Sequence, residues 1–306
     1  MGLWETLRGV FGRKTERLNV YARFEILRAA VSGTMSQFYV VRDKRTGQIA
    51  GLKIADREKV AFFESRFKGL NKPSEGEIAS QIRHPRVVET YEYGLTTENQ
   101  PYLLMEYLEG PGLQQLVFNR DPVLQQLRVR LVRQMAEALK AVHDAGFIHR
   151  DICPRNFLFT TRDCTDIKLI DFGLTLPARK EFMQPGNRTG TPLYMAPEII
   201  RRRHTDQRVD IFAFGVTAYH IITYELPWPA TEISGLAALA HDTQPPRDIR
   251  EYCPQLNETL AKAIMKCMEP APKDRFQSID QFLAAIASVP DEQVSGAGVE
   301  PHRTSG

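Results

Sequence analysis

The chain of 306 residues lacks several features that mark specialised classes of protein. It has only four cysteines, at positions 153, 164, 253 and 267, and none form the close pair typical of a metal site. Free thiols in a reducing cytoplasm are therefore expected. Neither sign of charge dominates, since 40 Lys and Arg oppose 37 Asp and Glu. This balance argues against nucleic acid or an acidic membrane as a partner.

Long hydrophobic runs and internal repeats are also missing. The longest apolar stretch, residues 209–223, contains Asp210, Thr217 and His220. It is short for a bilayer, so it predicts a buried helix and no transmembrane segment. Residues 290–306 have almost no apolar side chains and are predicted to be a disordered tail. The remainder, with 42% hydrophobic residues overall, has the composition of a globular protein.

Residues 1–22 are predicted to form an extension before the first strand. Their apolar side chains recur at helical spacing, which predicts a short amphipathic helix docked on the body or on a partner. Met1-Gly2-Leu3-Trp4-Glu5-Thr6 also fits the N-myristoylation pattern. Contact with a partner or a membrane through this extension is therefore left open. The helical stripe consists of Leu3, Trp4, Leu7, Val10 and Phe11.

Two regions of different pattern follow. Residues 23–106 contain β-rich runs, a Gly-containing turn at 43–47 that predicts a hairpin, and one helix at 75–82. The runs are 24–27, 38–41, 49–54, 87–93 and 102–106. Residues 107–289 are mainly helical, and their apolar side chains recur every three or four residues. The helices are expected over 124–142, 209–224, 256–267 and 278–287, with a short hairpin from 157–159 and 167–170.

Three short motifs occur in a fixed order in the second region. His149-Arg150-Asp151 is followed by Asn156, then by Asp171-Phe172-Gly173, and last by Ala196-Pro197-Glu198. Carboxylate and amide oxygens are hard ligands that suit Mg²⁺ shared with nucleotide phosphates. With Ala50-Gly51-Leu52-Lys53, the set resembles the signature of eukaryotic-type serine/threonine protein kinases, from about residue 24 to residue 288.

The resemblance implies a bilobal α+β fold. A small, mainly antiparallel β N-lobe with one regulatory helix would span residues 23–106, and a larger, mainly α C-lobe would span 107–289. It implies transfer of the γ-phosphoryl group of Mg-ATP to Ser or Thr hydroxyls of protein substrates. ATP and Mg²⁺ would be the cofactors, and a protein substrate would be the partner.

The resemblance also implies roles for single residues. Asp151 would accept the proton of the substrate hydroxyl, and Asn156 and Asp171 would hold magnesium. Lys53 would anchor the α- and β-phosphates and pair with a glutamate. Counting back from His84-Pro85 selects Glu75, with Glu77 as the alternative. Met105 would be the gatekeeper, and main-chain groups of Glu106 and Leu108 would bond the adenine. Further nucleotide contacts are expected at Val31, Gly33, Phe38 and Leu158.

Other residues are expected to be architectural or regulatory. His149 would pack on Phe172, Asp210 would anchor the catalytic loop, and Glu198 would pair with Arg275. Arg150 before the catalytic aspartate often accompanies control by phosphorylation of the activation loop. The candidate phosphosites are Thr189, Thr191 and the weaker Thr175, although Thr191 is better interpreted as part of the substrate-facing wall.

Two departures from the family pattern weaken the expected site. Only Gly33 survives of the three glycines in the phosphate loop, which predicts weaker nucleotide affinity. Cys153 stands where Ser/Thr kinases usually have a lysine, and Arg155 is expected to compensate as it does in tyrosine kinases. The Cys153 thiol is either reactive or an inert filler of space, and the inert interpretation is favoured.

These departures leave an alternative function open. A pseudokinase-like nucleotide-binding scaffold would explain the poor phosphate loop, but the retained metal ligands favour an active enzyme. The run from Gly190 to Glu198 resembles the Ser/Thr version of the substrate wall. The same run argues against a kinase of small molecules.

Overall fold

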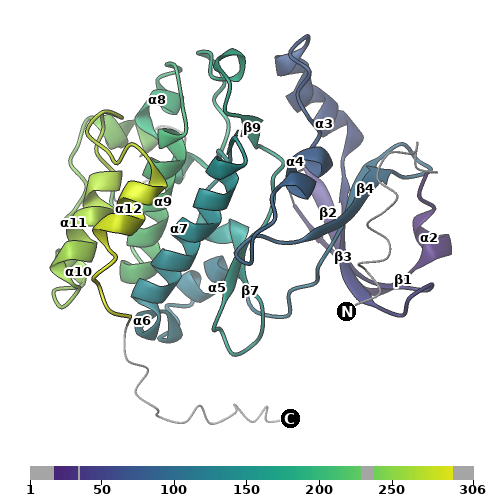
Figure 1. Ribbon diagram of the computed structural model, residues 1–306, viewed down its shortest axis with the longest axis horizontal. Coiled ribbons are helices and arrows are strands. Elements are labelled where there is room, and N and C mark those ends of the chain that lie inside the picture. Colours follow the sequence, from purple (N-terminus) through teal and green to yellow (C-terminus); the bar gives the residue numbers. More distant parts are fainter. Residues whose placement is uncertain (1–16, 34, 229–236, 292–306) are drawn as a thin grey trace.

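The computed structural model describes residues 17–33, 35–228 and 237–291, without the side chains of residues 29–32, 237, 238 and 242. The predicted amphipathic helix in residues 3–11 lies outside these ranges, as do residues 292–306 of the tail predicted for 290–306. A β-rich N-lobe and a helical C-lobe lie side by side, as Figure 1 shows. The bilobal α+β fold predicted from the sequence is therefore confirmed.

The N-lobe is built on one antiparallel sheet with the order β1-β2-β3-β5-β4. The predicted hairpin is present, and its turn contains Gly47 with a φ of +75°, a conformation that favours glycine. The strands are β1 (Phe24–Ser32), β2 (Ser36–Asp43), β3 (Ile49–Ala55), β4 (Thr90–Leu95) and β5 (Pro101–Met105). The fourth strand begins later than the predicted 87–93. Val87 and Val88 instead make backbone contacts with Leu169 of the C-lobe.

Alternation along the strands gives the sheet two different faces. One face carries a buried apolar cluster that includes Val41, Leu52 and Leu104. The residues between them face the C-lobe, and these include Phe38, Gly51, Lys53, Leu103 and Met105. The pairing therefore puts the predicted lysine and gatekeeper on the face that covers the second lobe.

The N-lobe has more helix than the sequence predicted. The expected helix is α4 (Glu75–Gln81), and Ser74 caps its N-terminus. The polar stretch before it was not expected to be helical, but it forms α3 (Arg57–Glu64) and a 3₁₀ turn, η2 (Ser65–Phe67). The prediction missed α3 because Phe63 is its one buried residue, so no apolar stripe marks it.

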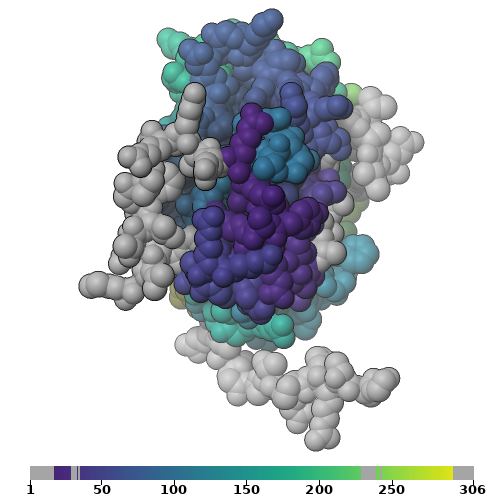
Figure 2. Space-filling view, turned by 90° about the vertical axis from the view of Figure 1, so that its right-hand side faces the viewer, coloured from purple at the N-terminus to yellow at the C-terminus, as the bar shows by residue number. Residues whose placement is uncertain are grey.

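The last residues of the predicted N-terminal extension pack on the N-lobe. Leu18 and Val20 are buried in the apolar cluster of the sheet, and Leu18 pairs with Thr96. A short helix, α2 (Val20–Arg23), then leads into β1. Figure 2 looks onto this lobe and shows the first described residues, in purple, across the middle of its surface.

Helices dominate the C-lobe. They are α5 (Leu113–Phe118), α6 (Val123–Gln126), α7 (Arg128–Asp144), α8 (Pro197–Ile200), α9 (Arg208–Thr223), α10 (Ile249–Tyr252), α11 (Glu258–Cys267) and α12 (Ile279–Ala285). The 3₁₀ turns are η3 (Pro154–Asn156), η4 (Lys180–Phe182), η5 (Pro192–Tyr194) and η6 (Ala237–Asp242). The single helix predicted over 124–142 is wrong in one respect. The chain leaves helical geometry at Leu127, where φ is −124°, so two helices form.

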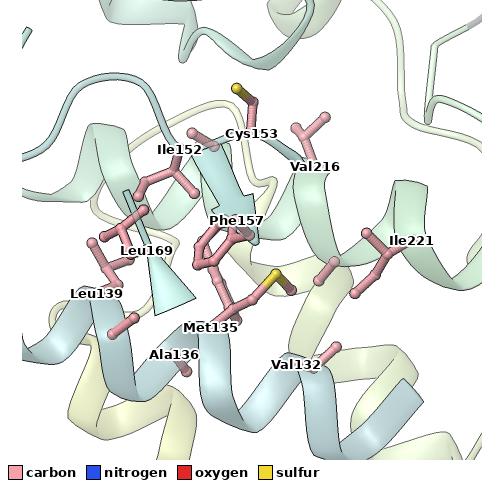
Figure 3. Close-up of a cluster of buried hydrophobic side chains, with 14 of the residues drawn as sticks. Val132, Met135, Ala136, Leu139, Ile152, Cys153, Phe157, Leu169, Val216 and Ile221 are labelled. Atoms are coloured by element: carbon pink, nitrogen blue, oxygen red, sulfur yellow. The ribbon is translucent and has the colours of Figure 1, made fainter. Parts of the chain in front are cut away.

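Two central helices organise the C-lobe core. The apolar stripe of α7 and nearly every residue of α9 are buried. Figure 3 shows Met135 of α7 against Phe157 and Leu139 of α7 beside Leu169. In the described part of the chain, no helix is both long enough and apolar enough to cross a membrane.

Candidate active site

A hairpin brings the two predicted metal ligands together. Strand β7 (Phe157–Phe159) pairs antiparallel with β8 (Ile167–Leu169). Asn156 directly precedes β7 and Asp171 closely follows β8, so antiparallel pairing makes them neighbours. The N–H of Ile170 donates to the carbonyl of Asn156 at 2.8 Å and locks this end of the hairpin.

Four groups hold the carboxylate of Asp151. The Asn156 amide nitrogen donates to its main-chain oxygen at 2.7 Å and to its Oδ2 at 3.0 Å. Thr191 donates to Oδ1 from its N–H at 2.9 Å and from its hydroxyl at 2.6 Å. The Arg155 guanidinium lies 3.2 Å from Oδ2. The carboxylate is thus fixed in position before any substrate arrives.

Lys53 links the two lobes through a pair of carboxylates. Its Nζ lies 2.6 Å from Oε1 of Glu75 and 2.8 Å from Oδ1 of Asp171. Burial alone would lower the pKa of Lys53, but the charges of Asp171 and Glu75 outweigh burial and raise it. Of the two glutamates considered, Glu75 reaches the lysine. Glu77 instead accepts from the N–H of Ser74 as part of a capping box.

Asp171 adopts a φ of +65°, which is unfavourable for a residue other than glycine by about 1–3 kcal/mol. Its Oδ1 accepts from Lys53 and from the N–H of Gly173 at 3.0 Å. Desolvation by the protein around Asp171 would raise its pKa, but Lys53 holds the pKa well below its usual range. The carboxylate is therefore ionised at neutral pH.

The donor set fits a hard divalent cation. The amide nitrogen of Asn156 is used by Asp151, which leaves Oδ1 of Asn156 to face a ligand. Neither this oxygen nor Oδ2 of Asp171 has a hydrogen-bond partner among the described residues. The Asp171 side chain is 46% exposed. Two neighbouring oxygens with free lone pairs are the partial shell in which Mg²⁺ keeps its waters and phosphate oxygens.

A buried aspartate supports the catalytic loop from below. Asp210 on α9 accepts from the N–H groups of His149 and Arg150, both at 2.7 Å, and contacts Nε2 of His143 at 3.0 Å. These bonds hold Arg150 at a φ of +70°. His149 packs edge-on against Phe172, with ring centroids 5.4 Å apart. The anchoring contacts suggested by the sequence are all present.

A second buried pair lies deeper in the C-lobe. The Arg275 guanidinium binds both oxygens of Glu198, at 2.7 and 2.9 Å, with almost no exposure of either side chain. Arg275 also donates to three main-chain carbonyls, those of residues 208, 269 and 270. This network ties the end of the activation segment to the rest of the lobe.

The segment after Met105 offers main-chain groups to a ligand. Met105 ends β5 and is buried, and Leu108 is largely buried. The N–H of Glu106 donates to Glu89, but its carbonyl and the N–H of Leu108 have no hydrogen-bond partner within the described chain. Because main-chain polar groups are nearly always paired, these two groups are available to a base.

The predicted phosphate loop turns at Gly33, whose N–H donates to the Ser36 carbonyl at 2.8 Å. Val31 pairs with Phe38 across the loop, but the side chain of Val31 lies outside the described part of the structure. Phe38 is half-buried under the sheet, and Leu158 is half-buried on β7. The sequence interpretation missed the importance of Gly51, although a glycine inside a strand often marks a close approach of another group.

The three candidate phosphosites differ in environment. Thr175 is fully buried, and the Thr191 hydroxyl is committed to Asp151. Thr189 is half-buried beside Asn187. The buried Arg150 guanidinium donates to the Asn187 carbonyl at 2.8 Å, and burial lowers the pKa of Arg150 to about 10. Accessibility therefore leaves Thr189 as the strongest of the three candidates.

Cys153 is buried rather than presented to solvent. Figure 3 shows it at the rim of the apolar cluster, near Val216. Burial, together with the charge of Asp151, raises the pKa of its thiol to about 12. A thiol protonated at neutral pH is a poor nucleophile, which supports the inert interpretation. The positive charge near Asp151 comes instead from Arg155, whose side chain is 59% exposed.

The fold has two lobes, and the Lys53–Glu75 ion pair of the N-lobe lies beside Asp171 of the C-lobe. Asn156 and Asp171 each have an oxygen that could bind a cation, and Asn156 also holds Asp151. This combination is typical of a protein kinase domain. The chain belongs to the protein kinase domain family, whose model matches residues 24–285. Members of this family use ATP with a divalent metal ion.

Similar proteins come from several bacteria. The serine/threonine-protein kinase Pkn1 of Myxococcus xanthus is 31% identical over 271 residues, 86% of this chain and 38% of that protein. The serine/threonine-protein kinase PknB of Mycolicibacterium smegmatis is 28% identical over 286 residues, 90% and 44% of the two chains. The tyrosine-protein kinase MasK of Myxococcus xanthus is 31% identical over 245 residues, 74% and 36%. The chain spans less than half the length of these relatives.

Proposed function

We propose that the chain transfers the γ-phosphoryl group of Mg-ATP to Ser or Thr hydroxyls of proteins. The observation that carries this proposal is the arrangement around Asp151, Asn156 and Asp171. Hydrogen bonds fix the Asp151 carboxylate, and one oxygen each of Asn156 and Asp171 has no hydrogen-bond partner in the described part of the chain. The names of Pkn1 and PknB support the choice of Ser and Thr.

Each residue would act by position and charge. Asp151 would orient the substrate hydroxyl and take its proton as the oxygen attacks the γ-phosphorus and the bond to the β–γ bridging oxygen breaks. Lys53, held by Glu75, would neutralise the α- and β-phosphates. Asn156 and Asp171 would hold Mg²⁺, which when bound neutralises charge on the phosphate oxygens. ADP would be the leaving product.

Arg155 would replace the lysine that Cys153 displaces. Its guanidinium contacts both Oδ2 of Asp151 and the Thr191 hydroxyl, at 3.2 and 3.1 Å. A cation here lies next to the point where negative charge gathers during transfer. The same contact with Thr191 places Arg155 where an incoming peptide would pass. Arg155 is therefore assigned to transition-state stabilisation.

The adenine would bind to the main chain. The free Glu106 carbonyl would accept from the base, and the free Leu108 N–H would donate to it, with Met105 and Leu158 supplying apolar contact. The poor phosphate loop predicts affinity weaker than in a typical family member. Submicromolar binding of Mg-ATP in a calorimetric titration would contradict that expectation. Because the co-substrate is ATP and all four cysteines are free thiols, we also place the activity in the cytoplasm.

The test is phosphate incorporation from γ-labelled ATP into the chain itself and into generic protein substrates, at millimolar Mg-ATP. Asp171→Asn is the matched control, because it keeps the shape of the side chain and removes its charge. Phosphoserine or phosphothreonine in the unaltered chain's reactions, absent with Asp171→Asn, is the expected result. Phosphotyrosine alone would make this a tyrosine kinase, and no incorporation would overturn the proposal in favour of a nucleotide-binding scaffold.

A further inference from the structure

The face of the N-lobe sheet that covers the C-lobe is here called the ceiling of the cleft. On this face the ring of Phe38 lies next to Gly51, which has no side chain. The register pairs Phe38 of β2 with Lys53 of β3, and Gly51 of β3 with Met105 of β5. All four positions therefore share the face that covers the C-lobe. Lys53 marks the phosphate end of this face, and Met105 marks the end from which the base-binding main chain continues.

The Phe38 ring lies across Gly51. A Cβ added at Gly51 would come within 2.7 Å of Cζ and 2.9 Å of Cε2 of Phe38, and within 3.3 Å of Cγ of Met105. Contacts under about 3 Å are too short for carbon atoms, which prefer about 3.5–4.0 Å. Gly51 does not have a positive φ, so its backbone would accept any residue. The volume taken by the ring is therefore what requires glycine here.

The ring would lie over a base that bound to the main chain of residues 106–108. The Phe38 side chain starts opposite Lys53, and the tip of its ring reaches Gly51, whose partner on the next strand is Met105. Below the ring, Phe157 and Phe159 of β7 are buried in the C-lobe core. Alternation along β7 turns Leu158 the other way, toward the cleft. A flat ligand bound to the main chain of residues 106–108 would therefore lie between an aromatic ceiling and an aliphatic floor.

We infer that Phe38 and Gly51 are a size-matched pair that determines how this chain holds the base of its nucleotide: the ring stacks on a purine, and the glycine makes room for the ring. This inference rests on the proposed use of ATP. Two loop glycines are missing at the phosphate end of the nucleotide. Contacts with the base therefore supply a larger share of the binding free energy. Stacking depends on the face of the base and not on its edge groups, so recognition of the edge stays with the main chain.

The test measures binding of two probes, adenosine and Mg-ATP, by calorimetry. Phe38→Val is expected to weaken both probes by the same factor, about threefold to tenfold, because an aromatic contact is lost at the base they share. Gly51→Ala is expected to weaken both by about tenfold or more, because the ring must then tip into the space of the base. Adding Phe38→Val to Gly51→Ala should restore binding to the level of Phe38→Val alone.

Three results would overturn the inference. These are equal losses from Gly51→Ala with and without Phe38→Val, tighter binding after Phe38→Val, and loss of Mg-ATP affinity with adenosine unchanged. Tighter binding would identify the ring as a plug of the cleft, and the third result would move it to the phosphate end. Phe118→Val, on the exposed Phe118 of α5, is the matched control and should change neither affinity.

Two further measurements distinguish a defect in folding from a loss of nucleotide binding. Thermal unfolding reports whether Gly51→Ala still folds. If it does not fold, binding of the two probes by Phe38→Val alone shows whether Phe38 contacts the base or the phosphates. A purely structural role of Phe38 would shift the melting temperature and leave the affinity of the folded protein unchanged. If the unaltered chain binds neither probe, the proposed function fails and the inference fails with it. Normal binding that is insensitive to both single substitutions overturns the inference alone.

Discussion

The floor of the cleft keeps the residues of the family pattern, whereas the ceiling does not. On the floor, hydrogen bonds hold both oxygens of the Asp151 carboxylate, and one hairpin brings Asn156 and Asp171 together. On the ceiling, the loop has one glycine, and the Phe38 ring fills the space beside Gly51. The difference follows from the physics of each surface. The floor needs particular oxygens in particular directions, whereas the ceiling supplies area and main-chain donors, which different residues can provide.

The largest effect should come from the floor. Asp151→Asn keeps the size of the side chain but removes the proton acceptor, so phosphate transfer should fall by about a hundredfold to ten-thousandfold. Affinity for Mg-ATP should change little, because Asp151 faces the substrate. Labelled phosphate transfer and calorimetry measure the two effects. Asp144→Asn, at the exposed end of α7, is the control and should be silent. Normal phosphate transfer by Asp151→Asn would show that the floor does not need this carboxylate, which would contradict the comparison of floor and ceiling.

The buried Glu198–Arg275 pair beneath the floor should be nearly as sensitive to substitution, but the effect should be on the free energy of unfolding. Arg275→Met leaves Glu198 as an unpaired buried charge, and breaking such a pair costs about 3–5 kcal/mol. Urea unfolding should show this loss, and adding Glu198→Gln should recover part of it. Glu258→Gln breaks an exposed pair with Lys262 on α11 and should have no measurable effect. Equal stability of the buried and exposed variants would contradict the account of the scaffold.

Helix α4 offers a sharper contrast within a single element. Glu75→Ala removes the partner of Lys53, and the resulting misplacement should lower phosphate transfer by between about tenfold and a hundredfold. Glu77→Ala removes half of the capping box and should lower stability by about 0.5–1 kcal/mol, with transfer preserved. Activity assays and thermal melts distinguish the two. Reversed effects would show that the wrong glutamate had been assigned to the lysine.

The smallest effect is expected at Cys153, beside the floor. With the pKa of its thiol raised to about 12, the thiolate is scarce from pH 7 to 9, and iodoacetamide should leave native Cys153 unlabelled. All four cysteines should react once the chain is unfolded in urea. Mass spectrometry of the native and unfolded samples provides the comparison. Rapid native labelling of Cys153 with loss of activity would revive the reactive interpretation.

Short local patterns in the sequence determine how Asn156 and Asp171 come together. Asp171 follows β8 and Asn156 precedes β7, so a hairpin of three-residue strands is enough to bring them together. The choice of Glu75 over Glu77 came from the resemblance to the family, by counting back from His84-Pro85. Capping explains why Glu77 is used elsewhere. Strands β2, β3 and β5 and helix α9 lie near their predicted positions because alternation and an apolar run mark them.

The sequence predicted less where long-range packing decides the structure. Nothing local marks α3, which has one buried residue, or the break at Leu127 inside an apolar stripe. Val87 and Val88 look like strand but bind the C-lobe. The fit of Phe38 over Gly51 joins two strands, and neither residue alone predicts it. These features depend on which surfaces meet, and single-chain patterns do not contain that information.

The most direct test is a crystal structure with Mg²⁺ and a non-hydrolysable ATP analogue. We predict the oxygens of Asn156 and Asp171 at about 2.0–2.1 Å from a common metal ion that also binds the phosphates. Asp151 should face the terminal phosphate across the space for a hydroxyl. A cleft filled by side chains, with these three residues turned away from one another and no nucleotide bound, would contradict the account.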